Sequence, residues 1–185
     1  MEIVVGVTGA TGTIYAMNLL RALKSTGKVN THLIMSDWAK ENLKIETNYS
    51  LEDIESLAAK VYDNKNLGAQ ISSGSFITDG MVIVPCSMKT LSSIASGYED
   101  NLISRTAGVI LKEGRKLILS PRETPLSPIH IENMLKLARL GVRIVPPMPA
   151  FYNHPRSIED FINHHVMKIL DQFGIEFDKA KRWQG

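Results

Sequence analysis

The sequence predicts a doubly wound α/β fold, in which helices cover both faces of a parallel sheet. Residues 3–7 form an apolar, β-branched run, which is typical of a strand buried on both faces. A turn containing Gly9 and Gly12 separates this run from an amphipathic helical pattern that begins at Thr13. Four further apolar runs alternate with helical patterns along the chain, as βαβ units require.

The apolar and helical patterns assign the elements in order. We expect strands at residues 3–7, 31–35, 80–84, 116–120 and 142–145. Helices are expected from residue 13, over 37–45 with Asp37 as the cap, over 51–61, from 88, and over 101–113, 130–140 and 157–173. Residues 62–78 are predicted to be a long polar loop, and the prolines within residues 146–149 form a stiff loop that permits a cis peptide bond.

Length and composition describe an ordinary globular chain, and we expect residues 1–185 to form one domain. A net charge of +2 without a basic stripe argues against nucleic acid as a partner. No apolar stretch approaches the roughly 20 residues that cross a bilayer, which predicts no membrane span. Cys86 is the single cysteine, and Met1 leads directly into a core strand. These two features predict no disulfide, no signal peptide and a cytoplasmic location.

The turn at residues 8–12 predicts an anion site, because free backbone N–H groups at a helix start attract phosphate. Its glycines are three residues apart, which departs from the G-x-G-x-x-G pattern of dinucleotide sites. The second strand ends at Ser36, where NAD-binding folds place an acidic residue. No Gly-Lys-Ser/Thr follows the first strand, so the triphosphate-binding loop is excluded. A mononucleotide such as FMN therefore fits better than NAD.

Other polar residues follow later strands and should lie at the same edge of the sheet. They are Ser87 and Thr90, which open the helix from residue 88, Arg122 and Glu123 between two prolines, and Tyr152. For Arg122 and Glu123, two readings stay open: a site for chemistry or an exposed ion pair in a turn. Cys86 has no histidine near it in sequence, so a small buried filler is expected rather than a nucleophile.

Three further groups of side chains have plain structural explanations. The pattern alone favours a solvated helix-end carboxylate for Glu46. Arg105 and Lys112 are seven residues apart and share one helix side, which is usually solvated. The histidines at 154, 164 and 165 lack the spacing of metal ligands, so no metal site is predicted.

Seven segments, in order over essentially the whole chain, resemble the flavin prenyltransferase family (UbiX/Pad1-like). They are residues 8–12 (TGATG), 85–91 (PCSMKTL), 101–105 (NLISR), 111–113 (LKE), 121–126 (PRETPL), 130–134 (HIENM) and 149–152 (PAFY). Residues 71–76 (ISSGSF) and 182–185 (RWQG) are similar to one branch of it, the B subunits of phenolic and hydroxyarylic acid decarboxylases.

The resemblance implies a flavodoxin-like or Rossmann-like three-layer fold that binds FMN and uses no metal. It implies an enzyme that joins a dimethylallyl group from dimethylallyl monophosphate to N5 and C6 of reduced FMN. The prenylated FMN then serves a separate UbiD-like decarboxylase. Family members assemble as homododecamers built from trimers, with active sites between subunits. The preference for mono- or diphosphate and the aromatic acid of the partner decarboxylase stay open.

The resemblance also implies roles for individual residues. Thr11 and Glu46 would move the N5 proton, and Glu123 would act as an acid–base partner. FMN would be held by Gly9, Ala10, Thr11, Ser36, Ser87, Thr90 and Arg122. The prenyl phosphate would be held by Lys112, Arg122, Tyr152 and Lys168, some of them from a neighbouring subunit. Arg105 would shape the site or an interface.

This sequence departs from the family pattern at two positions, and two other classes of function remain as alternatives. Lys168 stands where many relatives have Arg, and Leu67 lies about where some carry a Trp that walls the prenyl pocket.

One alternative is an FMN-dependent decarboxylase that acts directly on hydroxyarylic acids. Its cysteinyl-peptide relatives are disfavoured, since they carry an Ala-Asn-Thr turn where Cys86, Ser87 and Met88 stand here. The other alternative is a non-catalytic flavin carrier or electron-transfer module.

Overall fold

Six parallel strands form one sheet in the order β3-β2-β1-β4-β5-β6. The computed structural model describes residues 1–183. Its elements are β1 (Glu2–Val7), α1 (Thr13–Ser25), β2 (Asn30–Met35), α2 (Asp37–Glu46), α3 (Leu51–Glu55), β3 (Lys60–Asp63), the 3₁₀ helix η1 (Gln70–Ser72), β4 (Gly80–Cys86), α4 (Met88–Ser96), α5 (Leu102–Lys112), β5 (Lys116–Pro121), α6 (Pro128–Arg139), β6 (Arg143–Ile144) and α7 (Ile158–Phe173). The predicted doubly wound α/β fold is confirmed.

The strand order creates a crevice at one edge of the sheet. The chain builds outward from β1 through β2 to β3, and then crosses back to place β4 on the other side of β1. Val5 of β1 accordingly pairs with Leu33 on one side and Val82 on the other. Loops from β1 and β4 therefore diverge at the carboxyl ends of these strands. In doubly wound folds this switch point is where ligands bind.

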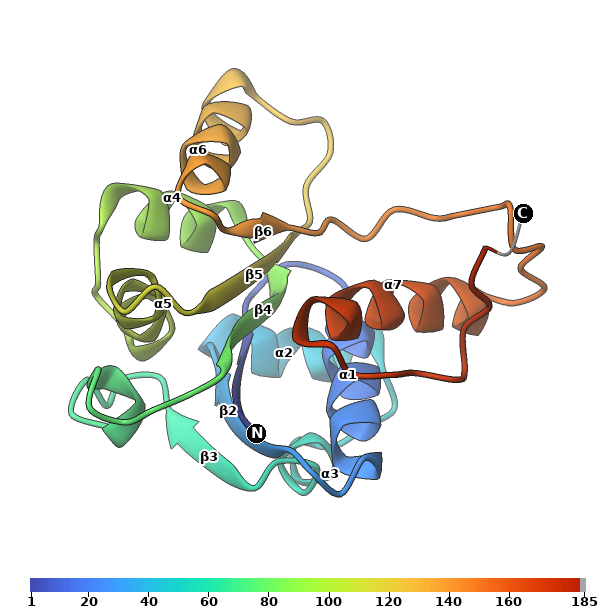
Figure 1. The fold of residues 1–185 in the computed structure, drawn as a ribbon, viewed down its shortest axis with the longest axis horizontal. Helices are drawn as coiled ribbons and strands as arrows, with labels where there is room; N and C mark the ends of the chain where they lie inside the picture. Colours follow the sequence, from blue (N-terminus) through green and yellow to red (C-terminus); the bar gives the residue numbers. More distant parts are fainter. Residues whose placement is uncertain (184–185) are drawn as a thin grey trace.

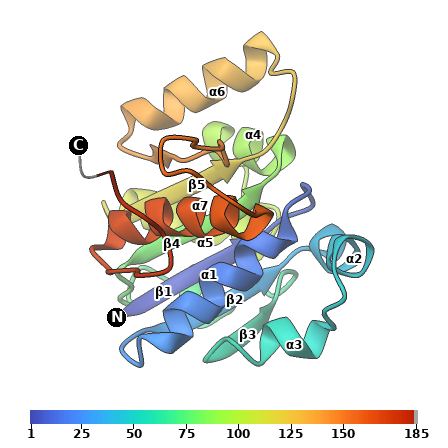
Figure 2. The ribbon, with the colours of Figure 1, turned by 90° about the vertical axis from the view of Figure 1, so that its right-hand side faces the viewer.

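Two hydrophobic cores fill the space between the sheet and its helices. Ile3, Val5 and Val7 point to the core beneath α1 and α7, whereas Val4 points to the core beneath α4 and α5. This alternation explains the unbroken apolar run of β1, because both of its faces are buried. Figure 1 shows α1 and α7 on one side of the sheet with α4 and α5 on the other, and Figure 2 shows α1 and α7 from their outer side.

The region from residue 50 to residue 63 differs from the expectation. The helix predicted over residues 51–61 ends at Glu55, and residues 60–63 form β3, a sixth strand at the edge of the sheet. Ser50 and Asp53 form a capping box that starts this short helix. After it, the amide of Ala59 donates to the carbonyl of Thr31 at 3.0 Å and aligns the chain beside β2. The loop predicted over residues 62–78 thus includes the end of β3 and η1.

Two smaller expectations were wrong. Ser36, not Asp37, caps α2, because its hydroxyl accepts the amide of Ala39 at 3.1 Å. The cis peptide bonds precede Pro85 and Pro125 rather than lying within residues 146–149. There the amide of Met148 instead donates to the carbonyl of Pro146 at 2.9 Å, in a tight turn of trans peptides.

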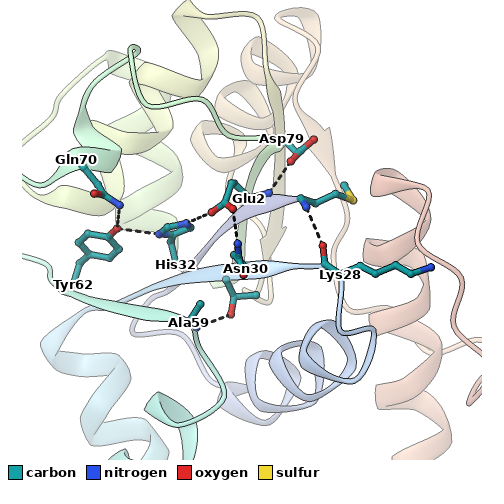
Figure 3. Close-up of polar contacts among 10 residues, drawn as sticks. Glu2, Lys28, Asn30, His32, Ala59, Tyr62, Gln70 and Asp79 are labelled. Carbon is teal, nitrogen blue, oxygen red and sulfur yellow. Dashed lines mark hydrogen bonds and ion pairs between the residues drawn. The ribbon is translucent and has the colours of Figure 1, made fainter.

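A chain of hydrogen-bonded polar side chains crosses the sheet near its amino edge, opposite the crevice (Figure 3). Glu2 Oε2 lies 2.6 Å from His32 Nε2, and His32 Nδ1 lies 2.9 Å from the hydroxyl of Tyr62. The amide of Gln70 donates to the same hydroxyl at 2.8 Å. These contacts join β1, β2, β3 and η1. They satisfy polar groups that would be costly to bury alone.

Neither a membrane-crossing helix nor a cluster of metal ligands is found over residues 1–183. The helices there are too short or too polar to span a bilayer. No group of three or more His, Cys, Asp or Glu side chains in that range is arranged to hold a metal ion.

Candidate functional site at the carboxyl edge of the sheet

The first turn of α1 is closed by a carboxylate from the end of α2. Gly12 precedes α1 with a φ of 108°, and it has no side chain to cap the helix. Glu46 Oε2 accepts hydrogen bonds from the amides of Gly12 at 2.9 Å and Thr13 at 3.0 Å, and from the Thr13 hydroxyl at 2.9 Å. The turn had predicted free amides for phosphate at this helix start. These two amides are instead occupied by Glu46. Glu46 is therefore not a merely solvated carboxylate.

Thr11 completes this group of hydrogen bonds. Burial alone would raise the pKa of Glu46, but hydrogen bonds from Thr11, Gly12 and Thr13 outweigh burial and lower it. The carboxylate is consequently ionised at neutral pH, at the positive end of the α1 dipole. Thr11 and Glu46, paired in the resemblance, are thus brought together at the edge of the crevice.

Buried Thr8 ties the two loops of the crevice to each other. Its hydroxyl donates to the carbonyl of Pro85 at 2.8 Å and accepts the amide of Ser87 at 2.8 Å. Ser87 in turn caps α4 by accepting the amide of Thr90 at 3.3 Å. Thr8 was not predicted to be a site residue. A hydroxyl directly after a buried strand was the available signal.

A cleft of about 420 Å³ lies between the starts of α2 and α4, within the usual range for small-molecule sites. Its lining includes Thr8, Gly9, Ser36, Trp38, Ser87 and Thr90. Within residues 1–183, the first-turn amides of Asp37, Trp38, Met88 and Lys89 have no hydrogen-bond partner. Two helix starts and several hydroxyls thus offer donors to an anion. This donor set fits the phosphate and ribityl chain of a mononucleotide.

Trp38 is a second residue that was not predicted to take part in the site. Its side chain is 69% exposed and stands at the rim of the cleft, next to Gly9. A Cβ at Gly9 would lie 2.6 Å from the Cβ of Trp38, so only glycine permits this approach. The indole is an exposed aromatic surface beside the cleft, whereas Leu67 is 45% exposed and does not line it.

A larger hollow of about 690 Å³ lies elsewhere, between α1, α7 and residues 176–182. Its rim mixes three carboxylates with Arg21, Lys179 and Arg182. It is remote from the carboxyl ends of the strands, where doubly wound folds bind their ligands. We therefore place the functional site in the smaller cleft.

Arg122 and Glu123 project from the end of β5. The amide of Arg122 donates to the carbonyl of Cys86 at 3.1 Å, which fixes the turn beside β4. Both side chains are exposed, and no ion pair joins them in the described chain. Glu123 instead accepts the amide of Thr124 at 2.9 Å. The reading of this segment as an exposed turn ion pair is wrong.

The charge of Arg122 acts on Tyr15 in the first turn of α1. Burial raises the pKa of Tyr15, and the charge of Arg122 opposes that rise. Tyr15 packs its ring against His165 at a centroid distance of 4.9 Å. His165 is buried and lies 2.8 Å from the Ser120 hydroxyl, just before the Arg122 turn. These contacts hold β5, α1 and α7 together beneath the site.

Tyr152 contacts α7 at His164, one helical turn before Lys168. The Tyr152 hydroxyl lies 2.9 Å from His164 Nε2, and Lys168 follows His164 by one helical turn. Burial and the charge of Lys168 both lower the pKa of His164. The structure thus groups two of the four side chains expected at a prenyl phosphate. His164 was not predicted to take part.

Lys112 is not at this edge within one chain. It ends α5, directly before the turn into β5, so it lies at the amino edge of the sheet. There it pairs with Glu113 in a shallow basin lined by Arg105 and the serine-rich turn of residues 72–75. Arg105 pairs with Glu99. Lys112 and the cleft are therefore brought together only if a second subunit supplies one of them.

Cys86 is fully buried at the end of β4. Burial raises its pKa to about 12, so the thiol stays protonated at neutral pH. This environment suits a packing residue rather than a nucleophile.

The chain is similar over its whole length to known proteins. Residues 1–167 match the family described as Flavoprotein. The flavin prenyltransferase LpdB of Lactiplantibacillus plantarum is 59% identical over 184 residues, which cover 100% of this chain and 98% of that protein. A dodecameric FMN-dependent UbiX-like decarboxylase from Escherichia coli O157:H7 is 56% identical and superposes with a TM-score of 0.99, each chain covered completely.

A further solved structure contains ligands. AnUbiX in complex with FMN and dimethylallyl pyrophosphate is 50% identical, with a TM-score of 0.97 over 100% of this chain and 97% of that one. The resemblance inferred from the seven sequence segments is confirmed by these relatives. The chain belongs to the flavoprotein family and, within it, to the UbiX-like flavin prenyltransferases.

Proposed function

We propose that this chain joins a dimethylallyl group from dimethylallyl monophosphate to N5 and C6 of reduced FMN. The prenylated FMN then serves a UbiD-like aromatic acid decarboxylase. The observation that carries this proposal is the full-length match to AnUbiX, whose structure contains FMN and dimethylallyl pyrophosphate. The cleft between α2 and α4 supports it with a donor set suited to a mononucleotide.

The cleft residues are proposed to bind FMN. Ser36, Ser87 and Thr90, with the free amides at the starts of α2 and α4, would hold its phosphate and ribityl chain. Gly9 and Ala10 would let the flavin approach the backbone of the first turn, and Arg122 would lie beside it. When bound and reduced, FMN supplies the two nucleophilic atoms of the reaction.

Four cationic or hydroxylic groups are proposed to hold the prenyl phosphate. Arg122 lies on the turn after β5, Tyr152 on the segment between β6 and α7, and Lys168 on α7. Lys112 would come from a neighbouring subunit. Negative charge grows on the phosphate as its C–O bond breaks. Fixed cations stabilise that charge in the transition state and thereby lower the barrier.

Proton transfer is proposed for the three remaining site residues. Glu46 is ionised and hydrogen-bonded to Thr11, so the pair can accept and pass on a proton at the edge of the crevice. Glu123 is exposed, and its carboxylate could exchange a proton with the leaving phosphate.

Assembly and location belong to the same proposal. We propose a homododecamer built from trimers, supported by the dodecameric relative from E. coli. The position of Lys112 at the edge of the sheet opposite the cleft also supports an assembly in which subunits share sites. Residues 1–185 would act as one FMN-binding domain, in keeping with a single sheet. The single cysteine supports a cytoplasmic location.

Direct decarboxylation is the second candidate function. It is favoured by one observation: the 56% identical protein from E. coli is described as an FMN-dependent decarboxylase. Such an enzyme would consume a hydroxybenzoate itself and leave the mass of its FMN unchanged.

Mass spectrometry of the extracted flavin separates these functions. The protein is incubated anaerobically with reduced FMN and dimethylallyl monophosphate, and in parallel with the diphosphate. We expect a flavin heavier by one C5 unit, lost in Glu123→Gln and Lys112→Ala. Lys44→Ala is the control, because it removes an exposed lysine paired with Glu41, away from the cleft.

Other outcomes would overturn the proposal. Unchanged FMN together with loss of an added hydroxybenzoate would establish the decarboxylase instead. Unchanged FMN that is only reduced and reoxidised would indicate a flavin carrier.

A further inference from the structure

We propose that His164 is a positioning residue that turns the hydroxyl of Tyr152 into a hydrogen-bond donor for the phosphate of the prenyl substrate. In this arrangement the imidazole Nε2–H donates to the phenol oxygen, and the phenol proton points away from the histidine. The inference rests on the proposed function, in which Tyr152 binds that phosphate.

His164 and Trp183 hold the ring of Tyr152 in place, while part of the ring stays exposed to solvent. Its hydroxyl lies 2.9 Å from His164 Nε2, and the two rings meet edge to face at 5.8 Å. Trp183 packs against Tyr152 edge to face at 5.7 Å. Tyr152 keeps 45% of its surface exposed, whereas His164 keeps 6%. The buried histidine thus holds the phenol oxygen at a fixed point, and the exposed side can meet a ligand.

The direction of the shared proton decides what Tyr152 can bind. A phenol has one proton, and a neutral imidazole carries a proton on only one of its nitrogens. If Nε2 accepts, the phenol donates to His164 and shows only lone pairs to the ligand. If Nε2 donates, the phenol proton is free for an anion. A phosphate oxygen accepts but does not donate when ionised, so only the second arrangement stabilises it.

The surroundings of His164 suit this role. Lys168 lies one turn further along α7, on the side of the helix that carries His164. Burial and the charge of Lys168 lower the pKa of His164, against the opposing charge of Asp171, and so disfavour a second proton on the imidazole. Lys168 also adds a cation to the helix side that contacts the Tyr152 hydroxyl. His165, the next residue, points instead to the Ser120 hydroxyl and is engaged in the core. His164 is therefore the histidine of the pair that can serve the ligand.

Two amide substitutions test the geometry. In His164→Gln the side-chain amide nitrogen can occupy the place of Nε2 and donate to Tyr152. In His164→Asn the amide reaches only the place of Nδ1, one bond short of the hydroxyl. We expect His164→Asn to raise the KM for dimethylallyl monophosphate about tenfold, the loss expected for one hydrogen bond to a charged group. The kcat should fall as well, because the same hydrogen bond stabilises the charge that grows on the phosphate as its C–O bond breaks. His164→Gln should restore both constants.

Binding of inorganic phosphate to the flavin-free protein, measured by calorimetry, gives a readout independent of turnover. It should weaken by a similar factor in His164→Asn and recover in His164→Gln. In a Tyr152→Phe background the His164→Asn substitution should cause no further loss, because the hydroxyl that it positions is absent. This cycle distinguishes positioning from general damage to α7.

Each result has a clear consequence. An unchanged KM and phosphate affinity in His164→Asn, or an equal loss with and without the Tyr152 hydroxyl, would overturn the inference while wild-type prenylation continues. Absence of prenylated flavin in the wild type, with the predicted change in phosphate affinity, would instead overturn the proposed function alone. If His164→Asn does not fold, equal phosphate affinity in wild type and Tyr152→Phe would overturn the inference.

Discussion

Glu46 holds Thr13 through two atoms at once, accepting its amide at 3.0 Å and its hydroxyl at 2.9 Å. The same carboxylate oxygen accepts the amide of Gly12 and so replaces the side-chain cap that α1 lacks. The hydrogen bond with Thr11 extends this group to the edge of the crevice. One side chain therefore stabilises a helix start and also places an ionised carboxylate at the proposed flavin site.

Substitutions of Glu46 should separate these two roles. Glu46→Ala leaves two amides without an acceptor, so we expect the free energy of unfolding to fall by about 1 kcal/mol, as for loss of a helix cap. Glu46→Gln keeps an acceptor oxygen and should retain most of that stability. Both variants should lose prenyl transfer by about 100-fold or more if the carboxylate moves a proton.

Denaturant titration measures the stabilities, and mass spectrometry of the flavin measures the transfer. Wild-type turnover in Glu46→Gln would show that this residue is a cap only. Glu41→Gln, which changes an exposed carboxylate on the same helix, is the matched control.

Mixing inactive variants should restore activity if Lys112 serves a neighbouring subunit. Lys112→Ala and Arg122→Ala each damage every site of a uniform oligomer. In a randomly mixed oligomer, about a quarter of the sites combine an intact Arg122 with an intact Lys112 from the neighbour. We expect roughly that fraction of wild-type activity after the two variants are unfolded together and reassembled.

The control for this experiment mixes Lys112→Ala with a Lys112→Ala/Arg122→Ala double variant, which should remain inactive. Failure of the productive mixture to exceed that control would show that Lys112 does not act on a neighbour's site. Chromatography with light scattering confirms that each mixture has reassembled.

The sequence predicted those parts of the fold that local patterns encode. The apolar run of residues 3–7 is buried on both faces, and Ser87 caps α4, because strand burial and capping depend on neighbouring residues. The helix over residues 51–61 was wrong, since Val61 and Tyr62 follow the pairing of β3 with β2, a contact distant along the chain. The strand was recognisable only once its partner was known.

In the candidate site, too, contacts between residues distant along the chain could not be predicted from the sequence. Ser36, Ser87 and Thr90 were predicted to share an edge because each follows a parallel strand, and all three line the cleft. The contacts of Glu46 and His164 were not predictable from spacing, because each bonds to a residue on another element. The family resemblance proposed Glu46 as a site residue, and the geometry adds its role as a cap.

Cys86 should be inert in the folded protein. Its thiol is fully buried, and burial raises its pKa to about 12, so almost no thiolate forms at neutral pH. We expect no labelling by iodoacetamide until denaturant is added. Cys86→Ala should keep wild-type prenyl transfer, at a cost of about 1 kcal/mol in stability from the small cavity. Rapid labelling of the native protein, or loss of turnover in Cys86→Ala, would point to a role in the reaction.

His165 should make the protein less stable in mild acid. Burial, aided by the charge of His164, lowers the pKa of His165 from its ordinary value of 6.5 to about 4. Between these two values the unfolded chain binds a proton that the folded chain does not, so stability falls as the pH falls through about 6.5 and levels off near 4. At 1.36 kcal/mol per pKa unit, this contribution is about 3 kcal/mol.

His165→Gln removes the titrating ring and keeps a side-chain amide near the Ser120 hydroxyl. Melting temperatures are compared at about pH 7.5 and about pH 5, at one protein concentration, because oligomers melt in a concentration-dependent way. The drop between the two pH values should be clearly smaller in His165→Gln than in wild type. His154→Gln, at an exposed histidine, should follow wild type. Equal drops in His165→Gln and wild type would mean that His165 is already free to ionise in the folded protein.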